Sequence, residues 1–314
     1  MISFPEVSIS KKTQNYRIVE KFLTIPYWEN KILFSKDIEV EYPFAPPGMI
    51  QKMIPFEFFA HCMWMQKVIS NWKATEVTII PTTDENLFWA IREEQADMIL
   101  GMRSGKYINE CVFRIVLEDG KIKQFREYGN PHAYYDVMNI ILPAFRYQCD
   151  TKQNVPCMRM KKGEKSKFSP EKNLKRAIAN YANPITGNDG DPEPIYADNV
   201  VEVTPYSAYD HTLYCSGKEF DIHMEWMFRN VLEWNTQENA PFYQSTDPKV
   251  IIVESYGYGK TSWGGRIGHY MQRELQIAHM NEEGKVDHFR VYYNPLYEYT
   301  SMNQNIPTIP YFNY

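Results

Sequence analysis

Four mainly apolar stretches in the first half of the chain are predicted to form strands. They are rich in β-branched and aromatic residues and span about 75–81, 87–93, 109–117 and 121–128. Between the last two stretches, Glu118-Asp-Gly120 is the short turn signal of a β-hairpin. The pattern therefore predicts an antiparallel sheet that contains one tight hairpin.

Helical stretches with apolar residues on one side accompany these strands. The first helix is predicted over about 13–23, with Val19 and Phe22 on one side. A related helix is expected to begin at Ser169-Pro-Glu-Lys172, because Ser is a good N-cap and Pro fits the first helical position. Two further helices are predicted around 61–72 and 223–234.

An internal repeat relates the two halves of the chain. Corresponding pieces lie 162 (201 − 39) to 164 (284 − 120) positions apart: Glu39–Phe44 with Val201–Tyr206, His61–Met65 with His223–Met227, Trp72 with Trp234, and Gly120 with Gly284. Offsets that agree over both halves indicate tandem domains. We expect a first α+β domain over 1–150, a basic linker over 151–168 and a second α+β domain over 169–314, each with helices against one curved antiparallel sheet.

Composition narrows the class of protein. Of the 314 residues, 44% are hydrophobic and 23% charged, which is typical of globular domains. The net charge of −5 and the lack of a basic, aromatic-interleaved stripe argue against a nucleic-acid partner. No apolar run is long enough for a membrane span, and the N-terminal residues lack a secretion signal. Five cysteines without C-x-x-C spacing predict a reduced, cytoplasmic setting.

One carboxylate distinguishes the two copies of the hairpin strand. The frame Gly-Lys-(Ile/Val)-x-x-Phe-Arg-x-Tyr-x-Asn-Pro is kept, but Glu127 of the first copy is Val291 in the second. Phe125 and Glu127 share one face of the strand. If this face is buried, desolvation raises the pKa of Glu127 toward neutrality, and the group can exchange protons near pH 7. The alternative is a solvent-exposed charge; we favour the buried orientation because Phe125 and its counterpart Phe289 need burial.

His61 is the second candidate. It shares a helical face with Trp64 and Met65, and the arrangement returns at His223 with Trp226. A charged histidine can hold a substrate carboxylate, and a neutral one can relay a proton. The alternative is a hydrogen-bonded core histidine, which is the commoner case on an apolar face.

Two other motifs are set aside. Gly257–Ser262 contains Gly-Lys-Thr, but a phosphate-binding loop needs a glycine at position 254, where the chain has Glu254. His132 and His269 have no partners at metal-ligand spacing, so no metal site is predicted.

The chain resembles the phenazine-biosynthesis A/B proteins of the nuclear transport factor 2-like (ketosteroid isomerase-like, polyketide cyclase-like) superfamily. Five motifs carry the resemblance: His61–Trp64, Asn86–Trp89, Asn109–Phe113, Leu117–Glu127 and Val253–Lys260. The resemblance implies two tandem cone-shaped α+β barrels that pair within the chain as a pseudo-dimer. A further homodimer is left open.

The resemblance also implies a small-molecule enzyme of secondary metabolism, without a cofactor. It would condense or cyclise planar or aminoketone-like substrates by imine formation. The catalytic roles fall on Glu127 and His61, in an active first copy beside a degenerate second one. Substrate-binding roles fall on Tyr42, Trp64, Trp89, Phe125, His223 and Trp226. Two alternatives stay open: isomerisation, dehydration or polyketide-type cyclisation in the same pocket, and a non-catalytic binding or resistance protein for a flat aromatic metabolite.

Overall fold

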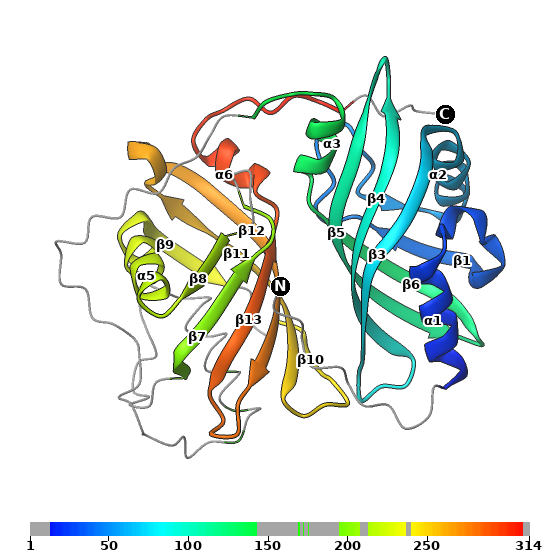
Figure 1. The fold of residues 1–314 in the computed structure, drawn as a ribbon. Helices are drawn as coiled ribbons and strands as arrows, with labels where there is room; N and C mark the ends of the chain where they lie inside the picture. The colour runs from blue at the N-terminus through cyan, green and yellow to red at the C-terminus, as the bar shows by residue number, and fades with distance from the viewer. Residues whose placement is uncertain are drawn as a thin grey trace. The chain divides into compact units, whose positions relative to one another are not determined.

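A computed structural model describes residues 13–142, 195–207, 213–236 and 240–309, with the single residues Ser169, Lys172 and Lys175. The chain divides into two compact units, Met1–Leu142 with Pro307–Tyr314, and Pro143–Ile306. Each unit has a mixed sheet flanked by helices, so the α+β fold class is confirmed (Figure 1). The expected linker over 151–168 lies outside the described residues, and the pairing of the units stays a prediction.

The sheet of the first unit has the strand order β2-β1-β6-β5-β4-β3. Its strands are β1 Phe34–Glu41, β2 Lys52–Met53, β3 Ile69–Pro81, β4 Leu87–Leu100, β5 Arg103–Glu118 and β6 Lys121–Gly129. The β1–β6 pair is parallel, and the other pairs are antiparallel. The four predicted strands are therefore confirmed, and three of them are several residues longer than predicted.

The β5–β6 hairpin turns at Asp119 and Gly120, which have φ angles of 49° and 69°. Positive φ at both central residues is the geometry of a type I′ turn, which Asp-Gly favours. Because the turn fixes the register, Glu127 lies opposite Phe113 on β5. The hairpin predicted from the sequence thus positions the candidate carboxylate.

Helices α1 (Gln14–Thr24), α2 (Pro55–Val68) and α3 (His132–Val137) belong to the first unit, with 3₁₀ turns at Tyr27–Glu29 and Lys31–Leu33. Thr13 caps α1 by accepting a hydrogen bond from Tyr16 N at 3.1 Å. Between these helices and the sheet lies a cluster of aromatic rings contributed by Phe22, Tyr27, Phe34, Phe58 and Phe125. All five are nearly or fully buried, so the face that carries Phe125 and Glu127 is the inner one.

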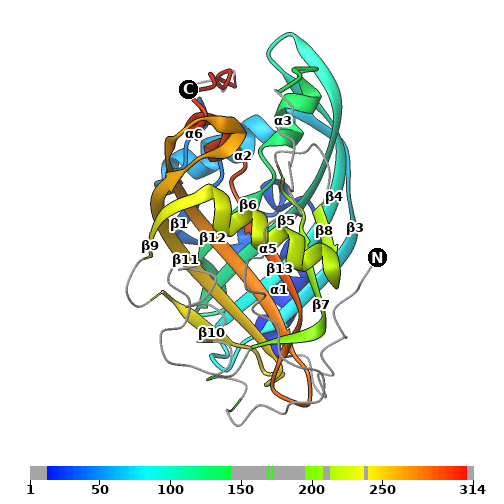
Figure 2. The ribbon, with the colours of Figure 1, turned by 90° about the vertical axis from the view of Figure 1, so that its left-hand side faces the viewer.

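The second unit repeats this order as β10-β11-β12-β13-β7-β8, with β9 also paired to β11. Its strands are β7 Tyr196–Thr204, β8 Leu213–Ser216, β9 Val231–Thr236, β10 Phe242–Gln244, β11 Val250–Thr261, β12 Gly268–Met280 and β13 Val286–Tyr293. Helix α5 (Lys218–Asn230) lies across one face of this sheet, and α6 (Leu296–Ser301) and a 3₁₀ turn at Trp263–Gly265 complete the described elements (Figure 2). The parallel β13–β7 pair matches β6–β1, which supports the duplication.

Two helix ends differ from the prediction. Helix α2 ends at Val68 and α5 at Asn230, so Trp72 and Trp234 lie on strands β3 and β9. In the first unit the backbone becomes extended at the β-branched residue Ile69, which has φ of −111° and ψ of 134°. A register shift between Ser70 and Lys73, with φ of 54° at Asn71, accommodates the change.

The helix expected from Ser169 lies largely outside the described residues, although Lys172 N donates to Ser169 Oγ at 3.3 Å, as an N-cap would require. The Gly-Lys-Thr motif at 259–261 lies on strand β11, not in a loop before a helix. Among the described helices, none is both long and apolar enough to cross a membrane.

Candidate active site

Glu127 lies on the inner face of β6, with 7% of its surface exposed. It borders a cavity of about 380 Å³, part of which is open to solvent. The walls include Tyr27, Tyr42, His61, Trp72, Arg92, Glu94 and Tyr134. Glu127 and His61 therefore face one cavity.

An ion pair lies beside Glu127 on strand β4. Arg92 Nη2 is 2.6 Å from Glu94 Oε2, and both side chains are almost fully buried. The Arg92 guanidinium also lies over the Phe113 ring, 4.5 Å from its centroid. Trp72 Nε1 donates to Glu94 Oε2 at 2.9 Å, so the register shift in β3 brings an indole to this pair.

The pKa of Glu127 is raised to about 8. Burial is the largest cause of this increase, and the charge of the neighbouring Glu94 carboxylate is the second. Arg92, Cys111 and Tyr27 act in the opposite direction. Among the described residues, Glu127 Oε2 has no hydrogen-bond partner. The site thus presents a carboxyl group that holds a proton at neutral pH and has one oxygen available to a ligand.

One group of side chains could hold a metal ion. Donor atoms of Glu94, Cys111 and Glu127 all lie within 4.8 Å of one another. The Arg92 guanidinium already supplies a positive charge at Glu94, and burial raises the pKa of the Cys111 thiol well above its usual range. These two facts favour the protonated, metal-free form of the group.

His61 comes from α2 and is 2% exposed. Burial lowers its pKa to about 3, so the imidazole is neutral at physiological pH. Its ring lies 5.5 Å from that of Tyr42 and 5.6 Å from that of Trp64. Of the two roles considered from the sequence, holding a substrate carboxylate by charge is disfavoured, and a neutral hydrogen-bonding role fits.

The expected wall residues divide into three groups. Tyr42 lines the cavity, and its hydroxyl lies 3.1 Å from that of Tyr27. Trp64 and Phe125 are buried behind the wall, against His61 and Tyr42 respectively. Trp89 points to the opposite face of β4 and stacks on Tyr128 at 6.2 Å, so its expected place in the wall is corrected. The reason is the alternation of β4, which turns Arg92 and Glu94 inward and Trp89 outward.

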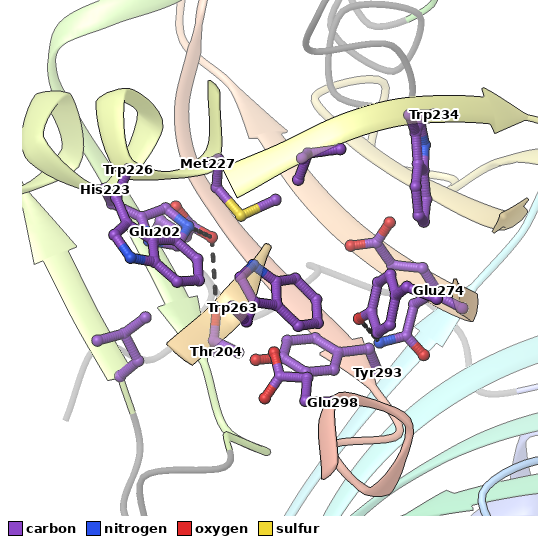
Figure 3. A pocket seen from close by; sticks show the side chains of 14 residues that line it. Glu202, Thr204, His223, Trp226, Met227, Trp234, Trp263, Glu274, Tyr293 and Glu298 are labelled. Atoms are coloured by element: carbon purple, nitrogen blue, oxygen red, sulfur yellow. Dashed lines mark hydrogen bonds and ion pairs between the residues drawn. The ribbon is translucent and has the colours of Figure 1, made fainter. Parts of the chain in front are cut away.

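The second unit has a larger cavity, of about 640 Å³ including space open to solvent (Figure 3). His223 and Trp226 of α5 line it, as does Trp234 of β9. Val291 is fully buried in the hydrophobic core of this unit, on the strand that corresponds to β6. The replacement of Glu127 by Val291 therefore leaves ordinary packing at that position.

Sequence reasoning missed several residues of the first cavity, namely Tyr27, Trp72, Arg92, Glu94, Cys111 and Tyr134. A signal existed for two of them. Phe88 and Ala90 are apolar positions on one face of β4, and a period of two extends this face to Arg92 and Glu94. Charged residues at inward positions of a strand are a mark of a buried site.

Both units thus have a mixed sheet with helices, and the first unit contains a buried carboxyl site. The model of the phenazine biosynthesis protein A/B family matches residues 56–150 of the chain.

Two relatives from Pseudomonas aeruginosa show the extent of the similarity. Phenazine biosynthesis protein PhzB1 is 30% identical over 87 residues, which cover 27% of this chain and 54% of PhzB1. PhzA2 is 27% identical over 84 residues, or 26% of this chain and 52% of PhzA2. The chain thus spans about half the length of the relatives it matches. A solved PhzB2 structure from the same organism aligns over 45% of this chain and 94% of that one, with 19% identity and a TM-score of 0.38.

Proposed function

We propose that the first unit is an acid/base site that joins or closes small planar, amine-bearing ketones by imine formation, as in phenazine-type biosynthesis. The observation that carries the proposal is Glu127: a buried carboxyl group with a pKa of about 8, facing a cavity with neutral His61. The family match over residues 56–150 supports the substrate class.

Imine formation needs a proton in one step and a base in the next. A substrate amine attacks a carbonyl carbon, and a hemiaminal forms. Protonated Glu127 donates its proton to the hemiaminal hydroxyl, the C–O bond breaks, and water leaves. The resulting carboxylate then takes a proton from the nitrogen. His61 and Tyr42 orient the reactants by hydrogen bonds, and the aromatic walls lower the entropic cost of bringing two molecules together.

The modest size of the cavity favours a second candidate within the same chemistry. The enclosed space beside Glu127 is small, which suits one compact ligand better than two. Dehydration, isomerisation or intramolecular ring closure of a single substrate would use the same proton donor.

We also propose a cellular compartment and a class of partner for this protein. Among the described residues, Cys62, Cys111 and Cys215 are buried and form no disulfide, which supports a reducing, cytoplasmic compartment. The partner is a small planar or aminoketone-like molecule rather than a nucleic acid.

Phenacylamine, an α-aminoketone, provides a direct test. Two molecules condense to a diphenyl-dihydropyrazine with loss of two waters, and absorbance reports the product. We expect the protein to accelerate this reaction at pH 7 and Glu127→Gln to abolish at least about 99% of the acceleration, since one general acid contributes roughly 10²–10⁴-fold. The matched control is Glu85→Gln, because Glu85 is exposed on a loop.

Equal rates for the wild-type and Glu127→Gln proteins would overturn the assignment of Glu127. The non-catalytic binding alternative predicts a different result. Calorimetry would then detect phenacylamine binding to both proteins, and neither protein would accelerate the condensation. Acceleration that both Glu127→Gln and Glu85→Gln retain would place the chemistry elsewhere in the chain.

A further inference from the structure

The cavity of the second unit has charged side chains, but they stand at other positions than those of the first cavity. Cross-strand pairs identify the corresponding positions: Arg92 pairs with Cys111 in the first unit, and Ser255 pairs with Glu274 in the second. The second unit therefore lacks the arginine and has a carboxylate where the first has a thiol.

Two further positions can be matched between the two units. Val40 pairs with Phe125 in the first unit, and Glu202 pairs with Phe289 in the second. By the offset of 164, Glu298 on α6 corresponds to Tyr134 on α3 (298 − 134). Carboxylates thus replace an apolar and an aromatic side chain.

Glu202, Glu274 and Glu298 all line this second cavity, which they reach from β7, β12 and α6 (Figure 3). Each is at most 6% exposed. Among the described residues that line the cavity, none is a lysine or an arginine. Buried carboxylates require positive charge nearby, so this distribution favours a cationic ligand.

Of the three glutamates, Glu202 shows the need for a nearby positive charge most directly, because it is only 1% exposed. Its Oε1 lies 3.6 Å from His223 Nε2 and accepts a hydrogen bond from Thr204 Oγ1 at 3.4 Å. Its Oε2 has no hydrogen-bond partner among the described residues. Burial raises the pKa of Glu202, and His223 acts in the opposite direction. A buried oxygen at the edge of a cavity is available to a donor on a ligand.

Aromatic rings form the remaining walls. Trp226 and Trp263 stack with ring centroids 6.0 Å apart and planes at 9°, and Tyr270 lies 4.4 Å from Trp263. Trp234 lies 5.7 Å from Tyr270 on the other side. Indole faces attract cations and pack against flat rings.

The spacing of the carboxylates separates an organic cation from a metal ion. Among the described residues, only Glu94, Cys111 and Glu127 bring three ligand atoms within 4.8 Å of one another. The three glutamates of the second cavity are too widely spaced to share one metal ion, but a ligand of several atoms can span them.

We propose that the second unit binds a planar organic cation, such as a protonated aromatic amine, between its indole walls and the Glu202, Glu274 and Glu298 carboxylates. This site is independent of the chemistry proposed for Glu127. It makes the second copy a binding domain of different charge preference, in contrast to the degenerate copy expected from the loss of Glu127.

Two probes of equal shape test the proposal at pH 8. 9-Aminoacridine is a cation at this pH, whereas acridine is neutral. By calorimetry with the full chain, we expect 9-aminoacridine to bind at least about tenfold more tightly, the range of a charge-assisted hydrogen bond. Glu202→Gln should remove most of this preference, and Glu127→Gln should leave it unchanged.

Equal affinities for the two probes would overturn the proposal, since the cavity would then be merely apolar. Loss of the preference in Glu127→Gln but not in Glu202→Gln would also overturn it, by placing the cation in the first unit. If Glu202→Gln does not fold, the wild-type ratio decides, together with Trp263→Phe, for which we expect weaker binding of 9-aminoacridine. Because no turnover is measured, the result does not depend on the proposed catalysis.

Discussion

Glu127, Glu94 and Arg92 share one buried space in which two carboxylates meet a single guanidinium. Arg92 Nη2 lies 2.6 Å from Glu94, so the charge of the arginine is committed chiefly to that carboxylate. Burial together with the Glu94 charge keeps the proton on Glu127. Two causes therefore keep Glu127 protonated: desolvation and the charge of the neighbouring Glu94 carboxylate.

The stability of the protein should fall with rising pH because of this one group. The pKa of Glu127 is about 8 in the folded chain against 4.5 as its ordinary value. Between these values the unfolded chain loses its proton while the folded chain keeps it, so the free energy of unfolding decreases as pH rises. Glu127→Gln should therefore be more stable than wild type at pH 9, on the order of 2–5 kcal/mol, and similar near pH 4.

Urea denaturation at several pH values measures this difference. The gap between the Glu127→Gln and wild-type proteins should open above about pH 4.5 and level off above about pH 8. A gap that does not change with pH would show that Glu127 ionises normally in the folded protein. Glu85→Gln, on an exposed loop, should show no such trend.

Removal of Arg92 should have a larger effect on stability. Arg92→Met leaves Glu94 buried without its cation, and breaking a buried pair in this way costs about 3–5 kcal/mol. The double variant Arg92→Met/Glu94→Gln should recover part of the loss, because the unpaired charge is gone. Arg126→Met is the matched control, since the Arg126–Glu41 pair is partly exposed and contributes less than about 1 kcal/mol.

Urea midpoints of the wild type, Arg92→Met, Glu94→Gln and the double variant complete a double-variant cycle. Equal losses for Arg92→Met and Arg126→Met would mean that the buried pair is not what stabilises the first cavity. A double variant no more stable than Arg92→Met would point to lost packing of the guanidinium on Phe113 and Trp72.

The sequence allowed Glu127 to be found because the repeat supplied its own comparison, Val291. It gave no signal for Cys111, and for Arg92 and Glu94 it gave only their period-two position on the face of Phe88 and Ala90. Their proximity depends on the register of β4 against β5 and β6, a non-local property. Trp89 was misplaced for the same reason, since orientation on a strand is decided by which face the sheet buries.

At the scale of elements, strand β3 of the first unit and its counterpart in the second unit show what the duplication preserved. β3 is continuous over Ile69–Pro81, whereas in the second unit β9 and β10 both pair with β11 and take its place. Trp72 and Trp234 begin these strands and reach the cavities. The sequence predicted the order of elements well, but it extended both helices by about one turn, since local pattern alone does not show where tertiary pairing takes over.

Gly257 on β11 is required by the indole of Trp234. A Cβ on Gly257 would lie 2.1 Å from Trp234 Cζ2, and Gly257 occupies the position of Glu94 in the first unit. Gly257→Ala should therefore displace Trp234, destabilise the second unit by about 1–3 kcal/mol and weaken 9-aminoacridine binding. Thermal unfolding and calorimetry measure the two effects.

The Trp234→Ala variant tests whether the clash with the Trp234 ring causes the effect of Gly257→Ala. If the clash is responsible, Gly257→Ala should cost much less in a Trp234→Ala background than in the wild-type protein. Equal costs in both backgrounds would attribute the effect to the backbone of β11.

At the scale of the whole chain, the final described residues belong to the first unit although they follow the second in sequence. Ile309 N donates to Pro47 O at 2.8 Å, and Tyr135 Oη donates to Pro307 O at 2.8 Å. The repeat predicted two domains in series, but it could not predict this return, because tertiary packing and not sequence order decides which unit holds the segment. A first domain cut at residue 150 lacks these contacts.

Ile309→Ala should therefore weaken the first unit selectively. The side chain is 1% exposed, and its truncation costs about 2–5 kcal/mol in a packed site. Hydrogen exchange followed by mass spectrometry should show faster exchange in peptides from β1 and α3, with little change in peptides from β11 to β13, because the lost packing belongs to the first unit alone. Thr308→Ala, at an exposed neighbour, should change neither set by more than about 0.5 kcal/mol. Unchanged exchange in the first unit of Ile309→Ala would mean that this segment merely rests on the surface, and faster exchange in both units would mean that they unfold as one cooperative body.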